Sequence, residues 1–226
     1  MQTNTYEGLH IINNSQSIKM DELVVEAPLQ ININSKAYSV VMRTPNNDKD
    51  LVFGLLYAED IYKNSSSIPL EVIKEEYGIP SIINVTIPTN VLGKGYLNKR
   101  TLLSVSSCGI CGKQQLEDLK VSGDKIVKKV SFSSESLLHM FGTLQKHQET
   151  FKKTGGSHAA GIFDKKFQLL TIREDIGRHN AVDKCVGSLL LKDHLKNGMY
   201  LLVSGRVSYE IVSKAFLAKI QVIVAV

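Results

Sequence analysis

Residues 169–191, LLTIREDIGRHNAVDKCVGSLLL, decide the fold that this sequence predicts. Residues 169–173 have the apolar character of a strand, and residues 180–191 have the spacing of a helix. One face of that helix is continuous and apolar, formed by Ala181, Val182, Cys185, Val186, Leu189 and Leu190. A strand that leads through a short polar turn into a helix is the repeating unit of α/β proteins.

The flanking sequence continues this alternation on both sides. Strands are predicted over residues 159–163, 200–204 and 222–226, and a further helix over residues 209–219. An earlier helix has Ser133 or Ser134 as its cap and ends at Gly155-Gly156; its apolar stripe is Leu137, Phe141, Leu144 and Phe151. Residues 131–226 are therefore expected to form an α/β layer structure with a largely parallel sheet.

The first 105 residues have a different pattern, and all five prolines lie before residue 89. Leu29, Ile31 and Ile33 alternate with polar residues, Asn34-Ser35 form a turn, and residues 38–42 return as a second strand. A helix follows with Asp48 or Asp50 as its cap, and its apolar residues are Leu51, Leu55 and Ala58. Strands over residues 72–77 and 82–87 complete a predicted α+β roll over residues 1–105, with residues 106–130 as connector.

Composition and charge limit the class of protein. At 226 residues with 43% hydrophobic and 22% charged residues, the chain can bury a core. No apolar run approaches the ~20 residues of a membrane span, and the N-terminus is not a signal peptide, so we expect a soluble, cytoplasmic protein. Residues 1–64 carry five Lys or Arg against eight Asp or Glu, whereas the whole chain is at +5. The basic remainder favours an anionic partner, but without long basic runs or Trp we expect no nucleic acid.

Cys108 and Cys111 form a C-x-x-C, which has three interpretations in a cytosolic protein. Half of a zinc site would need a second pair of ligands, such as Cys185 and a histidine. Cys185, however, lies on an apolar stripe, where a buried thiol is expected. A thioredoxin-like dithiol belongs to a fold with a downstream cis-proline, and no proline follows residue 88. In the third interpretation the cysteines carry sulfur, since flanking glycines and Lys113 favour an accessible, reactive thiolate.

Two strand-to-helix turns combine glycine with arginine: residues 173–180 (REDIGRHN) and residues 204–208 (SGRVS). At the carboxyl ends of strands, free N–H groups of helix N-termini meet ligands, so these turns predict an anion cradle. Alternatively, Asn180 and Ser208 are ordinary helix caps, and His179 pairs with Asp183. A third turn, residues 155–160, has a His-x-Ala that is similar to the His-x-Glu of zinc deaminases. It lacks the catalytic glutamate, so deaminase chemistry is not expected.

Together these residues resemble the FdhD/NarQ family of formate dehydrogenase accessory proteins. The resemblance rests on motifs spread over nearly the whole chain: EAPL at 26–29, Thr44-Pro45, Asp50-Leu51 through Gly54 and Glu59, SCGICGK at 107–113, TGGSH at 154–158, REDIGRHNAVDK at 173–184 and SGRVS at 204–208.

The resemblance implies a sulfurtransferase that moves sulfur from a cysteine desulfurase to the molybdenum or tungsten bis-molybdopterin guanine dinucleotide cofactor of formate dehydrogenase. Cys108 would hold a persulfide and Cys111 would assist. The family fold is a cytidine-deaminase-like α/β/α layer domain preceded by a smaller α+β roll. The predicted cofactor-binding residues are Gly155, Gly156, His158, Arg178, His179, Asn180, Ser204, Gly205 and Arg206.

The resemblance also implies a homodimer whose partners are the desulfurase and the catalytic subunit of formate dehydrogenase, with no structural metal and no membrane. Family members continue past residue 226 with a helix and a Phe-x-Arg segment associated with cofactor binding, so we expect the chain to be incomplete at its C-terminus. Two other functions stay open: a cofactor-binding chaperone whose cysteines carry no sulfur, and a small zinc protein.

Overall fold

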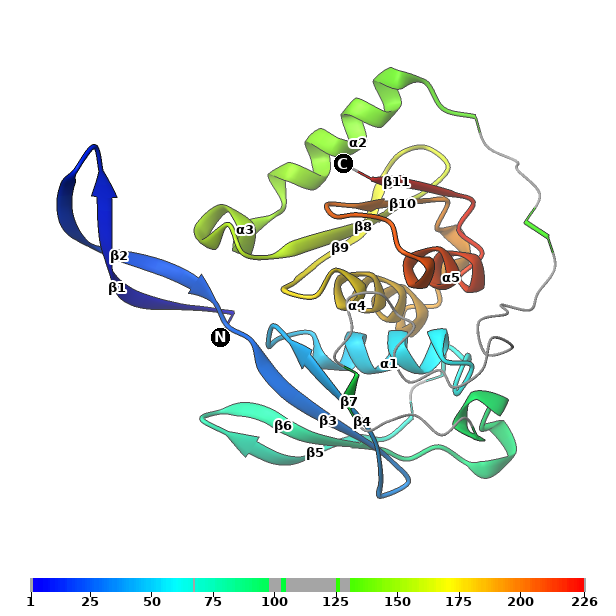
Figure 1. The fold of residues 1–226 in the computed structure, drawn as a ribbon. Coiled ribbons are helices and arrows are strands. Elements are labelled where there is room, and N and C mark those ends of the chain that lie inside the picture. The colour runs from blue at the N-terminus through cyan, green and yellow to red at the C-terminus, as the bar shows by residue number, and fades with distance from the viewer. Residues whose placement is uncertain (1, 67, 98–102, 105–124, 127–130, 226) are drawn as a thin grey trace.

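The structure, a computed structural model, describes residues 2–66, 68–97, 103–104, 125–126 and 131–225 (Figure 1). Its strands are β1 (Thr3–Ile12), β2 (Ser15–Val24), β3 (Ala27–Ile33), β4 (Lys36–Arg43), β5 (Leu70–Glu76), β6 (Ile79–Val85), β7 (Leu103–Ser104), β8 (His158–Phe163), β9 (Leu169–Asp175), β10 (Tyr200–Val203) and β11 (Val222–Ala225). Its α-helices are α1 (Asp48–Ala58), α2 (Ser134–Lys146), α3 (Glu149–Thr154), α4 (Arg178–Leu191) and α5 (Tyr209–Leu217), and short 3-10 turns lie at Thr89–Val91, Lys94–Leu97 and Leu195–Asn197.

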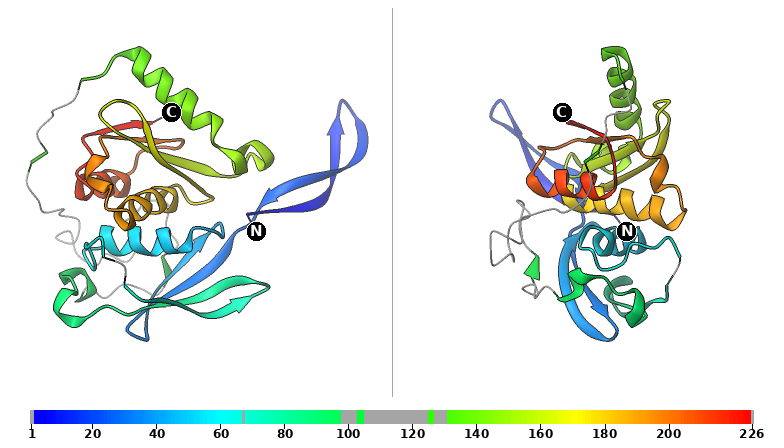
Figure 2. Two further views of the ribbon diagram at one scale, coloured as in Figure 1. Left: turned by 180° about the vertical axis from the view of Figure 1, so that it is seen from behind. Right: turned by 90° about the vertical axis from the view of Figure 1, so that its right-hand side faces the viewer.

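The described elements form stacked layers, which confirms a mixed α/β protein. A five-stranded sheet of order β5-β6-β3-β4-β7 lies on one side, and a four-stranded sheet of order β11-β10-β8-β9 lies on the other. Helices α1 and α4 lie between the two sheets, and α2 covers the far face of the four-stranded sheet (Figures 1 and 2). The limits of the predicted domains at residues 105 and 131 stay a prediction, because most of the connector lies outside the described residues.

The hairpin predicted near residue 34 is confirmed. Leu29, Ile31 and Ile33 of β3 are fully buried against α1, as the alternation of apolar residues requires. Asn34 and Ser35 have φ values of 50° and 64°, the left-handed conformation of a tight hairpin turn.

The prediction that Asp48 or Asp50 caps α1 is wrong. Asn47 occupies the cap position without a side-chain hydrogen bond, and α1 begins at Asp48. The two carboxylates instead form ion pairs: Asp48 holds the fully buried Arg43 at 2.9 Å, and Asp50 holds Arg173 at 2.7 Å. An arginine that is buried, as Arg43 is, or partly buried, as Arg173 is, needs a counter-ion, and this requirement outweighs local capping.

Helices α1 and α4 touch backbone to backbone. A Cβ atom added to Gly54 would lie 1.9 Å from the carbonyl oxygen of Asp183, and one added to Gly187 would lie 1.9 Å from that of Asp50. Each glycine thus sits against the backbone of the other helix, which joins the N-terminal α+β part closely to the α/β part.

The prediction of a largely parallel sheet in residues 131–226 is wrong. Strand β8 runs antiparallel to both of its neighbours, β9 and β10, and only β10 and β11 are parallel. The short turn after Phe163 makes β8 and β9 a hairpin, since the Asp164 N–H donates to the Gln168 carbonyl at 2.9 Å. Strands β9 and β10 still form a strand–helix–strand unit through α4, with β8 inserted between them.

The helix predicted before residue 155 is present as two helices. Ser133 caps α2 by accepting from the Ser136 N–H, and Gly155 ends α3 in the left-handed conformation with a φ of 64°. Both caps confirm the predictions. The interruption at His147 and Gln148 was not predicted.

A long hairpin of β1 and β2, here called the arm, was also not predicted. Its strands pair in unbroken antiparallel register from Thr3↔Val24 to Ile12↔Ser15, and Asn13 and Asn14 form its turn with positive φ. The arm projects away from both sheets (Figure 1). Among the residues that the structure describes, no helix combines the length and the apolar character needed to cross a membrane.

Candidate functional site

Three of the predicted segments meet at one edge of the four-stranded sheet. Strands β9 and β10 end where β8 begins, because β8 is antiparallel to both. The register pairs His158 with Asp175, and the Ser204 N–H donates to the Ala159 carbonyl at 3.0 Å. Helices α4 and α5 begin within a few residues of this edge, so both N-termini lie near it.

His158, Arg178, Ser204 and Gly205 form a cluster at this edge. The Oγ of Ser204 lies 3.4 Å from the Nδ1 of His158 and accepts from the Ala159 N–H at 2.8 Å. A Cβ atom on Gly205 would lie 3.1 Å from two atoms of the His158 ring and 3.5 Å from the Cδ of Arg178. The loop can lie this close to the histidine because residue 205 has no side chain. The structure thus brings these four predicted site residues together, and their binding of a cofactor stays a prediction.

The surroundings of His158 favour the neutral form of its imidazole. Its side chain is partly buried, and this burial, followed by the charge of Arg178, lowers the pKa of His158, whereas the buried Asp175 raises it by a smaller amount. A neutral imidazole offers one donor and one acceptor nitrogen. The positive charge of the site therefore comes from the arginines: Arg178 at the start of α4, and the exposed Arg206 directly after Gly205.

His179 lies outside this cluster. It is buried, its Nε2 lies 2.7 Å from the Oγ of Ser208, and its Nδ1 lies 3.5 Å from Glu210. Burial lowers the pKa of His179 to about 4. The histidine thus ties the first turn of α4 to the first turn of α5. The alternative pairing with Asp183 is wrong, because Asp183 forms a buried ion pair with Lys214 at 2.7 Å.

Asn180 is not the cap of α4. The helix begins two residues earlier at Arg178, with Gly177 as its cap. The Asn180 amide instead donates to the Met42 carbonyl at 2.7 Å and to Asp175 at 3.0 Å. The glycine cap has no side chain, and no side-chain hydrogen bond caps α4 within the described structure. The predicted cap at Ser208 is confirmed, since Ser208 accepts from the Ile211 N–H.

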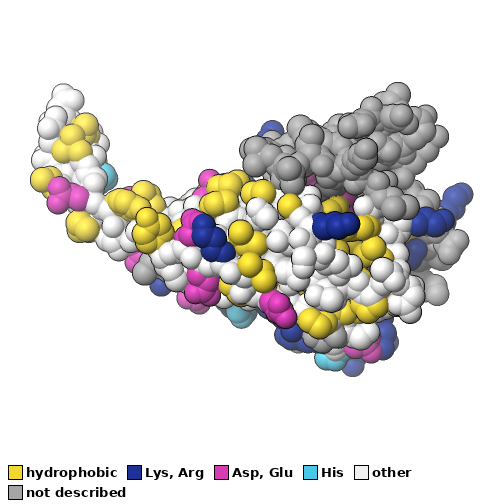
Figure 3. Space-filling view, turned by 90° about the horizontal axis from the view of Figure 1, so that it is seen from below, with side chains coloured by type: hydrophobic (Ala, Val, Ile, Leu, Met, Phe, Trp, Pro, Cys, Tyr) yellow, Lys and Arg dark blue, Asp and Glu magenta, His cyan; other side chains and the backbone are white. Residues whose placement is uncertain are grey.

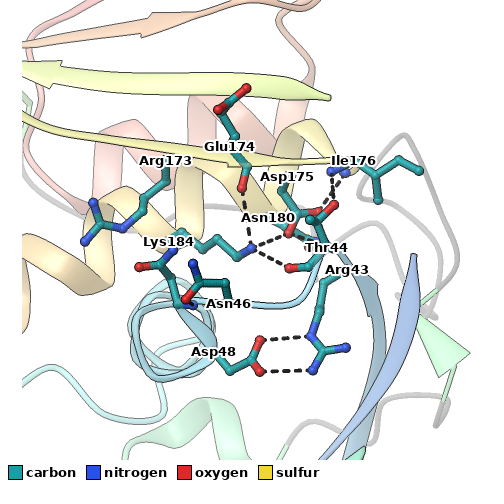
Figure 4. A network of polar contacts seen from close by, with 12 residues as sticks. Arg43, Thr44, Asn46, Asp48, Arg173, Glu174, Asp175, Ile176, Asn180 and Lys184 are labelled. Carbon is teal, nitrogen blue, oxygen red and sulfur yellow. Dashed lines mark hydrogen bonds and ion pairs between the residues drawn. The ribbon is translucent and has the colours of Figure 1, made fainter. Parts of the chain in front are cut away.

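A buried network behind the cluster fixes the turn between β9 and α4 (Figure 4). Asp175 and Lys184 are both fully buried and form an ion pair of 2.7 Å. Asp175 also accepts from the N–H groups of Thr44 and Gly177, and Lys184 donates to the Thr44 carbonyl at 2.8 Å. The network joins the turn that carries Arg178 to the N-terminal part of the chain.

Partial signals for this network are present in the sequence. The D-x-G spacing of Asp175 and Gly177 is typical of an Asp side chain that accepts from a backbone N–H two residues later. Lys184 stands next to the apolar Cys185 in the predicted helix, where a charge requires a buried partner. That its partners would include Thr44, 140 residues away, had no local signal.

Two other groups of predicted site residues stand apart. Gly155 and Gly156 lie in an exposed turn, and a Cβ atom on Gly156 would lie 3.0 Å from Val24 at the base of the arm. Their role at the site stays a prediction. Cys108 and Cys111 lie outside the described residues, so nothing tests their roles.

Cys185 is a core residue, as predicted. It is fully buried and its thiol donates to the Ala160 carbonyl at 3.0 Å. Burial raises the pKa of this thiol to about 12. Within the described residues, no three His, Cys, Asp or Glu side chains are grouped to hold a metal ion.

The side chains and helix N-termini at this edge of the four-stranded sheet are suited to bind an anion with several oxygen atoms. Arginine presents a planar set of donors for phosphate or carboxylate, and helix N-termini favour negative charge. The neutral His158 adds a hydrogen-bonding group without adding charge. These residues could hold a phosphate group, with Gly205 allowing close approach of the ligand to the backbone.

Comparison with known proteins identifies relatives over most of the chain. A protein of Sulfolobus acidocaldarius named sulfur carrier protein FdhD is 39% identical over 204 residues, covering 90% of this chain and 76% of the relative. One of the same name from Sulfurisphaera tokodaii is 34% identical over 229 residues, covering 99% of this chain and 84% of the relative.

A solved structure shows the same fold. It is the crystal structure of a putative formate dehydrogenase accessory protein from Desulfotalea psychrophila, with a TM-score of 0.74 at 19% identity, covering all of this chain and 84% of that one. Residues 24–226 match the model of the FdhD/NarQ family. The chain therefore belongs to the FdhD/NarQ family.

Proposed function

We propose that this protein is a sulfurtransferase that accepts sulfur from a cysteine desulfurase and passes it to the molybdenum or tungsten bis-molybdopterin guanine dinucleotide destined for formate dehydrogenase. Family membership and the names of the relatives support sulfur carriage. The structural observation that carries the proposal is the cluster of His158, Arg178, Ser204 and Gly205 at the edge of the four-stranded sheet. A dinucleotide with phosphate groups is the kind of anion that this edge can bind.

The sulfur step needs no external oxidant. A persulfide on the desulfurase has the form enzyme–S–SH, and the Cys108 thiolate attacks its outer sulfur. The S–S bond of the donor breaks, a new S–S bond forms on Cys108, and the donor leaves as a thiolate. For release, the Cys111 thiolate can attack the inner sulfur, on Cys108: the S–S bond of the persulfide breaks, a Cys108–Cys111 disulfide forms, and the outer sulfur leaves as hydrosulfide to the acceptor, so the two thiols supply the two electrons.

The cluster would bind the phosphates of the acceptor. Arg178 lies within the cluster and the exposed Arg206 lies beside it, while the buried Asp175 is neutralised by Lys184. The cofactor is a substrate here, and the residues bind and orient it rather than hold it permanently.

Sulfur loading is tested by intact mass after incubation with a cysteine desulfurase and cysteine. The wild type should gain one or more sulfur atoms that thiol reduction removes, and Cys108→Ala should gain none. Cys111→Ala should still load but release sulfur more slowly. Absence of loading in the wild type would refute the carrier function.

Phosphate binding is tested separately by titration with guanosine diphosphate, which represents one half of the dinucleotide. Arg178→Ala should weaken binding about 10-fold or more, the loss of about one charge-assisted pair. The matched control is Lys196→Ala, which removes an exposed lysine that is 72% accessible and pairs only with a neighbouring aspartate. Equal affinity of the wild type and Arg178→Ala would show that the cluster does not bind phosphate.

The second candidate function is a cofactor-binding chaperone whose cysteines carry no sulfur. The cluster also favours this function, because phosphate binding requires no thiol. In that case both cysteine variants would still bind cofactor and support formate dehydrogenase activity, whereas Arg178→Ala and Arg206→Ala would fail. Formate dehydrogenase activity in cells that express each variant distinguishes the two functions.

A further inference from the structure

Thr44, directly after β4, uses three of its polar groups to hold the turn between β9 and α4 (Figure 4). Its hydroxyl accepts from the Ile176 N–H at 3.0 Å, its own N–H donates to Asp175 at 3.2 Å, and its carbonyl accepts from Lys184 at 2.8 Å. Thr44 is fully buried. Its partners lie 131 to 140 residues later in the chain, so these bonds join two distant segments.

The end of β4 bonds the chain on both sides of Arg178. The Met42 carbonyl accepts from the Asn180 amide at 2.7 Å, two residues after Arg178, and the bond to the Ile176 N–H lies two residues before it. Arg178 is the arginine of the cluster, where its Cδ would lie 3.5 Å from a Cβ atom on Gly205. The end of β4 therefore fixes the backbone from which the Arg178 side chain extends.

The N-terminal part of the chain contributes little positive charge of its own. Residues 1–64 carry five Lys or Arg against eight Asp or Glu. On the side of the five-stranded sheet, Lys and Arg side chains are scattered over the face that Figure 3 shows. Arg43, next to Thr44, is fully buried and paired with Asp48 at 2.9 Å. This part of the chain therefore supports the anion site through hydrogen bonds rather than through charge.

The Thr44 hydroxyl is the acceptor for the Ile176 N–H. Replacing Thr44 by valine keeps the shape of the side chain but removes this oxygen. A backbone N–H without a partner is unfavourable unless it reaches water, so the turn would shift to expose it, and Arg178 would move with the turn. A group that binds a ligand through a planar set of donors must be held to within about 0.5 Å of its productive position.

We infer that Thr44 is a positioning residue of the phosphate site, which acts through the turn and does not touch the ligand. Its hydroxyl keeps the turn in the conformation in which Arg178 joins His158, Ser204 and Gly205. Without the hydroxyl, only a fraction of the molecules holds Arg178 in place, and the apparent affinity for phosphate falls in proportion to that fraction. Thr44 has this role only if the cluster binds phosphate, so the role rests on the function proposed above.

The hydroxyl can be removed without dismantling the buried network. Asp175 and Lys184 form a fully buried ion pair, so replacing either one leaves a buried charge without its partner and lowers the stability of the fold. The N–H and the carbonyl of Thr44, which bond to this pair, belong to the backbone and remain in every variant of Thr44. Thr44→Val therefore tests the hydroxyl alone.

The test is titration calorimetry of the full chain with guanosine diphosphate. Thr44→Val should raise the dissociation constant about 10-fold, the effect expected of one unsatisfied N–H. Thr44→Ser restores the hydroxyl and should stay within about 3-fold of the wild type. Two controls should bind as the wild type does. Thr143→Val makes the same exchange in α2, where the hydroxyl donates to the His139 carbonyl. Ile33→Val removes a buried methyl group at the other end of the β3–β4 ladder and lowers stability without touching the turn.

Equal affinity of the wild type and Thr44→Val would overturn the positioning role. So would a Thr44→Ser variant as weak as Thr44→Val, because the hydroxyl would not be the cause, or an equal loss in Ile33→Val, because reduced stability would explain both. A Thr44→Val protein that circular dichroism shows to be unfolded would mean that the hydroxyl serves the fold instead of the site.

The outcome also separates this role from the function proposed above. If Arg178→Ala weakens binding and Thr44→Val does not, only the role of Thr44 fails. If the wild type does not bind guanosine diphosphate, phosphate binding by the cluster fails, and the role of Thr44 fails with it.

Discussion

The contact between α1 and α4 gives a prediction whose sign opposes intrinsic helix propensity. Replacing Gly187 by alanine within a helix would ordinarily stabilise the protein by about 1 kcal/mol. Here the added Cβ atom would lie 1.9 Å from the Asp50 carbonyl oxygen and 2.7 Å from the Gly54 nitrogen. An ordinary contact begins near 3.4 Å, so the helices must separate by about 1.5 Å, the difference between 3.4 and 1.9 Å. Backbone atoms cannot rotate away as a flexible side chain can.

We expect Gly187→Ala to lower the free energy of unfolding by a net amount of about 2–4 kcal/mol, since overpacking outweighs the gain in propensity. That corresponds to a fall in melting temperature of about 4–16 °C for a chain of this size. The measurement is urea unfolding followed by far-UV circular dichroism. Gly142→Ala is the matched control: it also lies within a helix, α2, but nothing lies within 4 Å of its added Cβ. It should stabilise by up to about 1 kcal/mol.

A Gly187→Ala variant that is as stable as the wild type would refute the reasoning. It would mean that α1 and α4 can move apart at no cost. A destabilised Gly142→Ala would instead show that the comparison between the two glycines is not matched.

Three further predictions concern buried polar groups. Lys184→Met should lower the free energy of unfolding by about 3–5 kcal/mol because it leaves Asp175 buried without its cation. In urea unfolding, the double variant Lys184→Met/Asp175→Asn should lose at least about 1 kcal/mol less than the two single variants lose together. Strictly additive losses would contradict the pairing. In the folded protein the pKa of His179 is about 4, against 6.5 for the free group. As the pH falls from 6.5 to 4, His179 therefore takes up a proton in the unfolded chain but not in the folded one. The free energy of unfolding should fall by about 3 kcal/mol over that range. A pH series of urea midpoints in which His179→Gln shows the same fall would exclude this cause. Cys185, with a pKa of about 12, should resist iodoacetamide at pH 8 until the protein is unfolded, as shown by mass spectrometry; rapid alkylation of the native thiol would contradict its burial.

Much of the local structure could be predicted from the sequence. The alternation around Leu29 fixes the strand and its buried face, and Asn34-Ser35 fixes the turn, because both depend on neighbouring residues. The helix predicted over residues 180–191 follows from its apolar spacing, and the structure begins it two residues earlier, at Arg178. The arm was missed because its apolar residues, such as Tyr6, Leu9, Ile11 and Ile12, fall on both faces of the hairpin and do not show the regular alternation of β3.

The candidate site was predictable only in part. Glycine and arginine after predicted strands indicated the turns that meet at His158 and Gly205, because strand ends gather at the edge of a sheet. His179 and Asn180 stand in the same motif, yet their side chains turn to Ser208 and to the Met42 carbonyl. Sequence spacing cannot distinguish a residue that faces the ligand from one that holds the turn in place.

The sequence by itself determined the family, the α/β character and the residue types of the site, because motifs and short-range periodicity indicate these features. Only the tertiary structure decided the antiparallel place of β8, the backbone contact between α1 and α4, and the burial of Lys184 against Asp175 and Thr44. Each of these depends on residues far apart in the chain. Packing between elements decides whether a charge is buried and which group neutralises it. Local sequence patterns do not indicate that packing.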